Sequence, residues 1–281
     1  MNSFIFSFKN IKVILFQFCA MFLIYNLYIG INQPVILSYQ NQWQQNYAAA
    51  QGFIYDKKSK NVIVGSSLAA RIQKKALVVG FSNLSFSGGS VLTGLEIIKR
   101  SDFVPKKIFV EINTIFREQD IKMLDSLFYP IWYKVKNYFP ALREKNQPLN
   151  LGLTELKSVY GKTHEEHMKE TRNQRVYETA LKLQKAEHSV EQKDYLNKLE
   201  QLKLLLSYFE TKKSEIVFFE MPVEPVLTQS KSMQHIRRVL KRAFPSKKVI
   251  TSKQNYNTSD GLHLLYKDAF AFTKEFNKLI D

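Results

Sequence analysis

The sequence predicts an α/β fold with a five-stranded parallel sheet, carried by one N-terminal transmembrane helix. Short apolar runs alternate with segments of helical periodicity, which is the pattern of parallel strands joined by helices. One uncharged apolar run near the N-terminus is long enough to cross a bilayer. The rest of the 281 residues fits one large domain better than two small ones, and a hydrophobic content of 45% supplies a sizeable core.

The transmembrane helix is expected at residues 13–31. This run has no charged residue and, at about 1.5 Å per residue, reaches roughly across a hydrocarbon core of about 30 Å. Lys9 and Lys12 precede it, whereas residues 32–55 carry no charge, so the positive-inside rule predicts a cytoplasmic segment at residues 1–12 and an extracytoplasmic domain. A cleaved signal peptide and a buried soluble helix are the competing interpretations. The absence of a nearby small-x-small cleavage motif disfavours the first.

Residues 32–55 are expected to form a stalk or a first amphipathic helix, followed by the α/β domain at residues 56–281. The formal net charge is +16, which suits anionic lipid headgroups or an anionic surface polymer, although a solvated lysine-rich surface is the plainer interpretation. Because no nucleic-acid motif accompanies this charge, we expect no nucleic-acid partner.

The strands and helices of the domain are expected in alternation. The strands are predicted at residues 61–65, 76–79 with an extension towards residue 86, 107–112, 215–221 and 248–251. The helices are predicted at residues 68–75, 91–99, 233–244 and 266–280.

A long insertion at residues 117–209 separates the third and fourth predicted strands. Its stretch at residues 195–208 has leucines at helical spacing and is expected to be the crossover helix that packs on the sheet. The aromatic side chains of residues 128–139 are expected to pack internally or to lie near the membrane rather than to stack on sugars. A lid, a partner-binding element and a polymer-contact surface remain alternatives for the insertion as a whole.

Polar and glycine residues follow the predicted strands where each strand ends. Ser67 follows the first strand, Gly88 the second, and Asn113 ends the third, while Asp260 and His263 follow the fifth. In an open parallel sheet these places lie at the carboxyl edge, where ligands bind. We therefore expect one pocket to contain all of these residues.

Each of these residue types suits one task in acyl transfer. A serine hydroxyl becomes a nucleophile when an imidazole takes its proton, and the imidazole needs a carboxylate on its other nitrogen. Asp260 and His263 are three residues apart, so the carboxylate can reach the ring. The Asn113 side chain and the Gly88 backbone offer N–H donors of the kind that an oxyanion hole needs. The plainer alternative is that Ser67 caps a helix and that Asp260 and His263 form a loop hydrogen bond.

Taken in order, these motifs resemble the blocks of the SGNH hydrolases, also called the GDSL esterase/lipase superfamily. The blocks are Gly65-Ser66-Ser67-Leu68, residues 83–88, residues 111–113 and Asp260-Gly261-Leu262-His263. The resemblance covers residue 61 to the C-terminus apart from the insertion. It implies a three-layer αβα sandwich with strand order 2-1-3-4-5. It also implies Ser67 as nucleophile, His263 as base and Asp260 as its orienting carboxylate, with Ser67, Gly88 and Asn113 forming the oxyanion hole.

Three positions depart from the family pattern. Ser66 stands in place of the usual Asp of the first block, Glu111 in place of the usual Gly of the third, and Thr114 in place of the Asp that follows the Asn. Ser66 is thus a second serine that competes for the role of nucleophile, and alignment to the block favours Ser67. Glu111 is bulky for its position and is therefore expected to affect the shape of the pocket.

Such relaxed blocks are similar to those of membrane-tethered members that modify cell-surface polysaccharides. The resemblance therefore implies a cofactor-independent O-acyltransferase, most simply of acetyl groups, that acts on a bacterial cell-surface polysaccharide through an acyl-Ser67 intermediate. A single-span protein cannot carry an activated acyl group across a membrane, so a multi-span membrane acyltransferase is implied as a partner. An extracytoplasmic carbohydrate esterase or deacetylase and a non-catalytic scaffold for polysaccharide modification remain alternatives.

The remaining histidines are expected to have no catalytic role. His164 and His167 miss the H-E-x-x-H spacing by one residue and have no third ligand nearby, so a solvated charged helix is expected and no metal. His188 and His235 lie among lysines and arginines and are expected on the surface.

Overall fold

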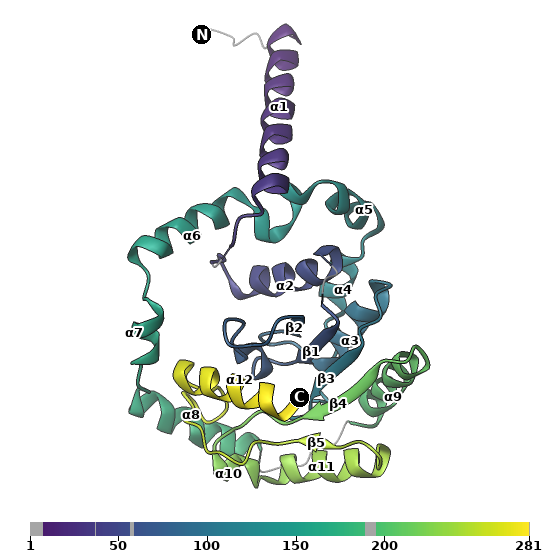
Figure 1. Ribbon diagram of the computed structural model, residues 1–281, viewed down its shortest axis with the longest axis vertical. Coiled ribbons are helices and arrows are strands. Elements are labelled where there is room, and N and C mark those ends of the chain that lie inside the picture. The colour runs from purple at the N-terminus through teal and green to yellow at the C-terminus, as the bar shows by residue number, and fades with distance from the viewer. Residues whose placement is uncertain (1–7, 37, 57–58, 189–194, 281) are drawn as a thin grey trace, which may run out of the picture. The chain divides into compact units, whose positions relative to one another are not determined.

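The protein has an α/β fold built around a parallel sheet (Figure 1). The computed structural model describes residues 8–36, 38–56, 59–188 and 195–280, which leaves residues 1–7 of the expected cytoplasmic segment outside the described residues. Within the described part, the sheet has five strands in the order β2-β1-β3-β4-β5. All neighbouring strands of the sheet pair in parallel. The strands are β1 (Asn61–Gly65), β2 (Phe81–Ser85), β3 (Lys107–Glu111), β4 (Glu215–Phe219) and β5 (Val249–Ile250).

Four of the strand predictions are confirmed, and the second is confirmed only in its extension towards residue 86. β1 has the predicted bounds, and β3, β4 and β5 lie inside the predicted ranges. Residues 76–79, however, form a turn, and β2 begins only at Phe81. The side chain of Val79 is fully exposed and Gly80 has a φ of +94°, so the apolar residues of this run belong to a reversal of the chain rather than to the sheet.

The helices occupy most of the remaining chain. The α-helices are α1 (Phe8–Asn32), α2 (Gln42–Asp56), α3 (Val91–Arg100), α4 (Ile121–Leu127), α5 (Pro130–Tyr138), α6 (Pro148–Tyr160), α7 (His164–Met168), α8 (Gln174–Glu187), α9 (Leu196–Thr211), α10 (Pro225–Thr228), α11 (Lys231–Ala243) and α12 (Tyr266–Ile280). Three short 3₁₀ turns are present among the described residues, namely η1 (Ala69–Arg71), η2 (Pro140–Leu142) and η3 (Glu144–Asn146).

The helix predicted at residues 68–75 is wrong. Only η1 forms there, and it ends at Arg71 because the ψ of 120° at the following residue, Ile72, leaves the helical region. The backbone N–H of Gln73 then donates to Thr273 Oγ1 of α12 at 2.9 Å. A tertiary contact thus takes the donor that would otherwise continue a helix.

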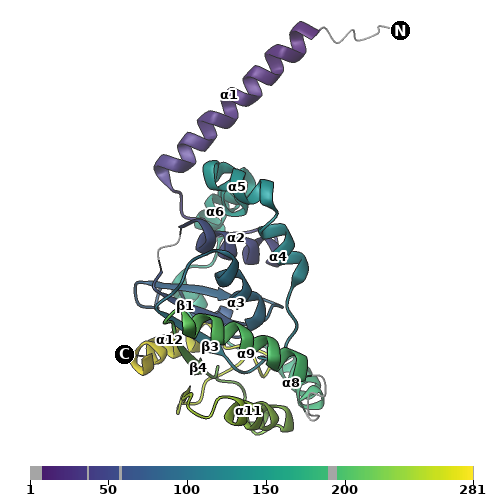
Figure 2. The ribbon, with the colours of Figure 1, turned by 90° about the vertical axis from the view of Figure 1, so that its right-hand side faces the viewer.

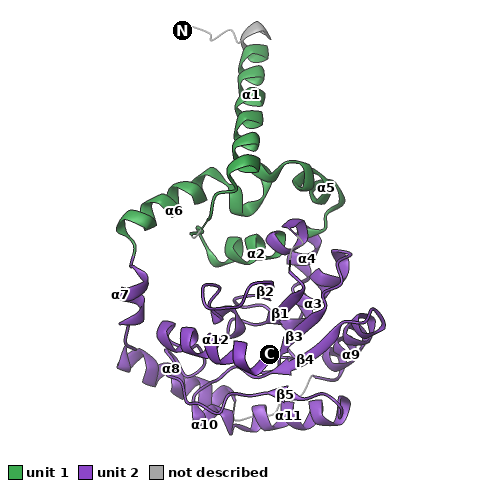
Figure 3. Ribbon diagram, viewed as in Figure 1, with its two compact units in different colours: residues 1–51, 127–161 green, residues 52–126, 162–281 purple. Residues whose placement is uncertain are grey.

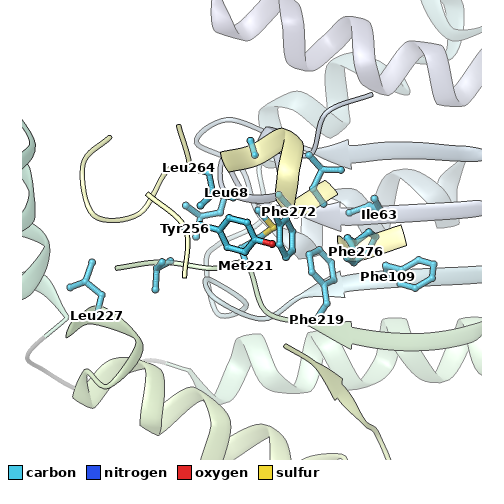
Figure 4. Close-up of a cluster of buried hydrophobic side chains, with 14 residues drawn as sticks. Ile63, Leu68, Phe109, Phe219, Met221, Leu227, Tyr256, Leu264, Phe272 and Phe276 are labelled. Atoms are coloured by element: carbon cyan, nitrogen blue, oxygen red, sulfur yellow. The ribbon is translucent and has the colours of Figure 1, made fainter. Parts of the chain in front are cut away.

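One face of the sheet packs against α12, which has its predicted bounds. Ile63, Phe109 and Phe219 project from three neighbouring strands into a buried cluster (Figure 4). The ring centroid of Phe276 lies 5.7 Å from that of Phe109 and 5.1 Å from that of Phe219. The same cluster includes Leu68 and other residues next to the carboxyl edge of the strands, so the core continues to the place where the candidate site lies.

The other face packs against α3 and α9, which are in contact with each other (Figure 2). A Cβ on Gly94 of α3 would lie 2.9 Å from Val64 Cγ1 and 3.0 Å from the Leu84 carbonyl oxygen, so glycine is what lets α3 approach β1 and β2. α9 buries Leu202 and Phe209 and contacts β4, which confirms the predicted crossover helix.

The described residues group into two compact units (Figure 3). The anchor unit comprises residues 1–51 and 127–161, and the sheet unit comprises residues 52–126 and 162–281. The predicted insertion is therefore divided, because its residues 127–161 group with the N-terminal segment while its two ends group with the sheet. The expected stalk is helical from Gln42 onwards, and residue 37 within it lies outside the described residues.

In the anchor unit, α1 packs against the turn around η2. The Phe22 and Phe139 rings lie 5.6 Å apart, and the Ala141 N–H donates to Asn26 Oδ1 at 3.1 Å. Among the described residues, residues 11–32 form one helix that is long and apolar enough to cross a membrane.

Candidate active site

Ser67 lies in a tight turn directly after β1. The carboxylate of Glu111, the last residue of β3, holds this turn through hydrogen bonds. The Ser66 N–H donates to Glu111 Oε2 at 2.7 Å, the Ser66 hydroxyl lies 3.0 Å from both carboxylate oxygens, and the Ala69 N–H donates to Oε2 at 3.3 Å. Ser66 is fully buried in this arrangement. The two adjacent serines therefore have different positions, and only Ser67 faces the histidine described below.

Gly65 makes this arrangement possible. A Cβ at this position would lie 2.6 Å from Glu111 Oε2, 2.6 Å from Ala69 Cβ and 2.9 Å from Ser85 Oγ, distances that real Cβ contacts do not reach. The glycine at the end of β1 is thus required for the close approach of the carboxylate to the turn.

Asp260 and His263 lie in a compact loop between β5 and α12. An antiparallel bridge between Thr258 and Leu264 closes this loop, and Gly261 has a φ of +94°, which favours glycine. Asp260 Oδ1 accepts hydrogen bonds from the His263 N–H at 2.7 Å and the Leu262 N–H at 3.0 Å. The aspartate therefore organises the loop as well as contacting the imidazole.

The three side chains form a continuous hydrogen-bonded chain. Ser67 Oγ lies 2.8 Å from His263 Nε2, and His263 Nδ1 lies 2.6 Å from Asp260 Oδ2. An ionised carboxylate only accepts, so Nδ1 carries the proton and Nε2 accepts the hydrogen bond from the serine hydroxyl. The side chains of His263 and Asp260 are 24% and 28% exposed. These side chains are therefore partly shielded from solvent but still accessible to a ligand. These contacts have the connectivity that a nucleophile, a general base and an orienting carboxylate require.

The pKa of Asp260 fits this assignment. Burial of the side chain favours the neutral carboxyl, but the hydrogen bonds from the His263 ring, the His263 N–H and the Leu262 N–H outweigh burial and lower the pKa of Asp260 from 3.8 to about 2. Asp260 therefore stays ionised at pH values well above about 2.

We expect this lowered pKa to appear in the stability of the protein. A carboxyl whose pKa is lower in the folded state adds stability above its unfolded pKa of 3.8, and this stability is lost as pH falls through about 2. The melting temperature of the detergent-solubilised chain should exceed that of Asp260→Asn by a constant margin above pH 3.8, and the margin should shrink as pH falls towards 2. A margin that grows in acid would contradict the assignment.

A cavity of about 470 Å³ opens beside the Ser67–His263 pair, a volume within the range typical of ligand sites. All of its lining residues belong to the sheet unit. They are Ser67, Leu68, Asn113, Thr114, Arg117, Gln184, Glu187, His188, Ser232, Ile236, Leu262 and His263. Charged and hydroxyl- or amide-bearing side chains predominate, which suits a polar ligand.

The two predicted oxyanion donors differ in how the structure places them. Asn113 lines the cavity and is held by the backbone of Met221, since Asn113 Nδ2 donates to the Met221 carbonyl at 2.9 Å and the Met221 N–H donates to Asn113 Oδ1 at 2.7 Å. An amide NH₂ carries two hydrogens, and this contact uses one. Gly88 follows β2 at the same sheet edge, is exposed and has a φ of +73°, but it is not among the described residues that line the cavity.

Several residues of the cavity were not predicted from the sequence. Arg117, Gln184 and Glu187 come from the insertion, where nothing in the local pattern marks them. Among the described residues, Thr114 Oγ1 and Gln184 Oε1 are buried side-chain atoms with no hydrogen-bond partner. Such atoms at a cavity wall suit a ligand that carries its own donors.

The expectation for the other histidines is wrong for one of them and incomplete for another. His235 is buried in α11, with its ring 4.8 Å from that of Tyr195. His188 is partly exposed, as expected, but it also lines the cavity. His164 and His167 lie in the short helix α7, which begins with a capping box. Within the described ranges, no group of three metal-binding side chains is found.

Comparison with known proteins assigns no family to this chain, since it matches no family model and no curated protein. Function is therefore inferred from the side chains of the site and from the apolar helix.

Proposed function

We propose that this chain is a membrane-anchored serine O-acyltransferase that moves an acyl group, most simply acetyl, onto a bacterial cell-surface polysaccharide through an acyl-Ser67 intermediate. The observation that carries the proposal is the hydrogen-bonded chain of Ser67, His263 and Asp260, with contacts of 2.8 Å and 2.6 Å, beside a polar cavity. Ser67 and His263 are 196 residues apart in the sequence, so the hydrogen bond between them is not the local loop contact that the plainer alternative requires.

The fold supports assignment to the SGNH type. The strand order β2-β1-β3-β4-β5 is the order that the sequence resemblance implies. Helices α3 and α9 pack on one face of the sheet and α12 on the other, which is compatible with a three-layer αβα sandwich. In such a sheet the first and last strands both deliver loops to the carboxyl edge, where Ser67 and His263 meet.

In the first half of the proposed reaction, Ser67 Oγ attacks the carbonyl carbon of the acyl donor. His263 Nε2 takes the hydroxyl proton and then gives it to the leaving group, which departs as the acyl-serine ester forms. Asp260 accepts the Nδ1–H hydrogen bond and stabilises the imidazolium that exists between these two proton transfers. No group other than these side chains is needed to balance the step.

In the second half, a sugar hydroxyl enters the cavity and attacks the acyl-serine. His263 Nε2 removes the proton of this hydroxyl, the new ester forms on the sugar, and Ser67 Oγ leaves and regains the proton. The oxygen that becomes negative in both halves needs N–H donors, and we assign these to the Ser67 backbone, the Gly88 backbone and the second hydrogen of the Asn113 amide.

The departures from the family pattern compensate for one another in this proposal. The first block lacks its usual aspartate because position 66 is serine, but Glu111, at the position of the usual glycine, supplies a carboxylate to the same turn. The bulky side chain lies below the turn and is fully buried, so it does not occupy the cavity.

In this proposal the site lies outside the cytoplasm, which the apolar helix and its flanking charges support. Lys9 and Lys12 lie on the cytoplasmic side, and the uncharged residues 32–55 follow on the other side. An acyl donor made in the cytoplasm then has to cross the membrane, so a multi-span membrane acyltransferase is proposed as the partner that supplies it. The basic net charge of +16 suits an anionic acceptor glycan.

The proposal is tested with the purified full-length chain, a chromogenic acetyl ester and oligosaccharides from a bacterial surface polysaccharide. We expect acetyl groups to appear on the sugar, detected as a mass increase of the oligosaccharide, and the rate of ester consumption to rise with sugar concentration. Release of free acetate alone, at a rate that does not depend on the sugar, would identify an esterase. Absence of both products would favour a scaffold role.

A further inference from the structure

Helix α6 buries polar residues and exposes apolar ones, which is the reverse of the pattern in a surface helix of a soluble protein. Its buried residues are the polar Asn150 and Thr154, of which Asn150 Nδ2 donates to the Glu144 carbonyl at 2.7 Å and Thr154 Oγ1 accepts from the Ser38 N–H at 3.3 Å. A surface helix in water shows the opposite pattern, with its apolar stripe buried and its polar side outside.

The opposite side of α6 carries an exposed apolar stripe. Leu149, Leu156 and Tyr160 recur at the spacing of one helix face and are 56%, 57% and 84% exposed. Lys157, also exposed, lies next to the stripe. No other described segment of the protein covers this stripe.

Helix α5 shows the same feature and has no buried residue. Ile131, Trp132 and Tyr138 lie on one side of this helix and are 62%, 52% and 75% exposed, with the exposed Lys134 beside them. Tryptophan and tyrosine are enriched at membrane–water boundaries, where one part of the ring is apolar and the other is wet. Lysines beside such a stripe can extend to anionic headgroups.

Both helices belong to the same compact unit as α1, and they extend to either side of its C-terminal end (Figure 3). The turn between them, which contains η2, contacts α1 at Phe22 and Asn26. The turn therefore lies against one side of α1 well before the helix ends at Asn32, while Leu23, Ile24 and Leu27 stay exposed.

The length of α1 then sets the depth of this turn. From Val13, where the uncharged run begins, to Asn26, which contacts the turn, the helix rises about 20 Å at 1.5 Å per residue. A hydrocarbon core is about 30 Å thick, so a bilayer crossed by α1 extends about 10 Å further, over the turn and the helices attached to it. Interfacial amphipathic helices are buried by about 5 to 10 Å, which matches this difference.

We propose that α5 and α6 are interfacial helices that lie in the extracytoplasmic lipid–water boundary of the membrane crossed by α1. Their stripes contact acyl chains, and Lys134 and Lys157 reach the headgroups. Residues 127–161 of the anchor unit then form an interfacial collar beside α1. This inference rests on the anchoring that is part of the proposed function, but not on the acyl-transfer chemistry.

The two tryptophans of the chain allow a direct test. Trp43→Phe leaves Trp132 as the single tryptophan of the full-length protein, which is reconstituted into phosphatidylcholine/phosphatidylglycerol vesicles. We expect lipids brominated near the top of the acyl chain to quench Trp132 fluorescence by at least about twofold, and aqueous iodide to quench it weakly, as for a residue at an apolar boundary. For α6, Leu156→Trp in a Trp43→Phe/Trp132→Phe background should behave in the same way.

The matched control is Asn137→Trp in the same tryptophan-free background, because Asn137 lies on the other side of α5. Iodide should quench it more strongly than it quenches Trp132. A separate flotation assay tests whether the chain is anchored in the vesicles. A chain that floats while Trp132 and the tryptophan at position 156 remain open to iodide would overturn the collar but leave the anchor intact. Protection that appears only after a membrane protein is added would also overturn lipid contact, in favour of a protein partner. Failure to float would contradict the anchoring itself.

Discussion

Replacement of Ser67 by alanine is expected to lower the rate of acyl transfer by about 10⁴-fold or more, since loss of the nucleophile leaves only the contribution of substrate binding and the oxyanion donors. The same substitution should abolish covalent labelling of the chain by a fluorophosphonate, which reacts with a serine activated by an imidazole. His263→Ala should have a similar effect on both measurements, because the hydroxyl depends on His263 Nε2, 2.8 Å away.

Ser232→Ala is the matched control for this prediction. Ser232 lines the same cavity and undergoes the same chemical change, but it is not part of the hydrogen-bonded chain. We expect this variant to retain labelling and to lose less than about tenfold in rate, as for a residue that contributes only to binding. A Ser67→Ala protein that folds normally and keeps its acyl-transfer rate would contradict the proposed reaction and favour the scaffold role.

Replacement of Glu111 by alanine is expected to have the largest effect on the stability of the sheet unit. It removes the acceptor of the Ser66 and Ala69 N–H groups and of the Ser66 hydroxyl, all of which lie at a fully buried place. Unpaired buried donors and the cavity left behind should together lower the free energy of unfolding by about 3 to 5 kcal/mol. The turn that positions Ser67 should also shift, and a displacement of about 1 Å typically costs about 10²-fold in rate.

Glu111→Gln separates loss of shape from loss of charge. Glutamine keeps an oxygen for the two N–H donors and an NH₂ group that can donate to the Ser66 hydroxyl, so we expect a loss of about 1 kcal/mol or less in a denaturation experiment. Burial raises the pKa of Glu111, although the hydrogen bonds from Ser66 and Ala69 act against this. The stability of the wild type relative to Glu111→Gln should therefore decline as pH rises above 4.5, the value for an unperturbed group. Equal stability of the alanine and glutamine variants would contradict a supporting role for this side chain.

Parts of the structure that depend on local pattern were predicted well. The apolar run of α1, the strand β1 and the helix α12 follow from hydrophobic runs and periodicity, which report how much of a segment is buried. The edge on which Ser67, Asn113, Asp260 and His263 lie also follows from the sequence, because parallel strands present their carboxyl ends on the same side.

Predictions failed where a long-range contact competes with a local preference. The expected helix after Ser67 does not continue because the Gln73 N–H bonds to Thr273. The expected strand at residues 76–79 is a turn that ends in Gly80, although its residues are apolar. Burial of an apolar residue depends on what the rest of the chain brings beside it, and a window of neighbouring residues does not contain that information.

The sequence by itself determined the fold class, the apolar N-terminal helix and the residue types of the candidate triad, because each of these is encoded in composition and short-range spacing. Only the tertiary structure decided that Ser67 rather than Ser66 meets His263, across a separation of 196 residues, and that the Glu111 carboxylate supports the turn that carries Ser67. It also decided that the apolar stripes of α5 and α6 face outward. The physical reason is that an apolar stripe can be covered by protein or by lipid, and a hydroxyl can bond any acceptor within about 3 Å, so the outcome depends on which distant groups the folded chain brings within reach.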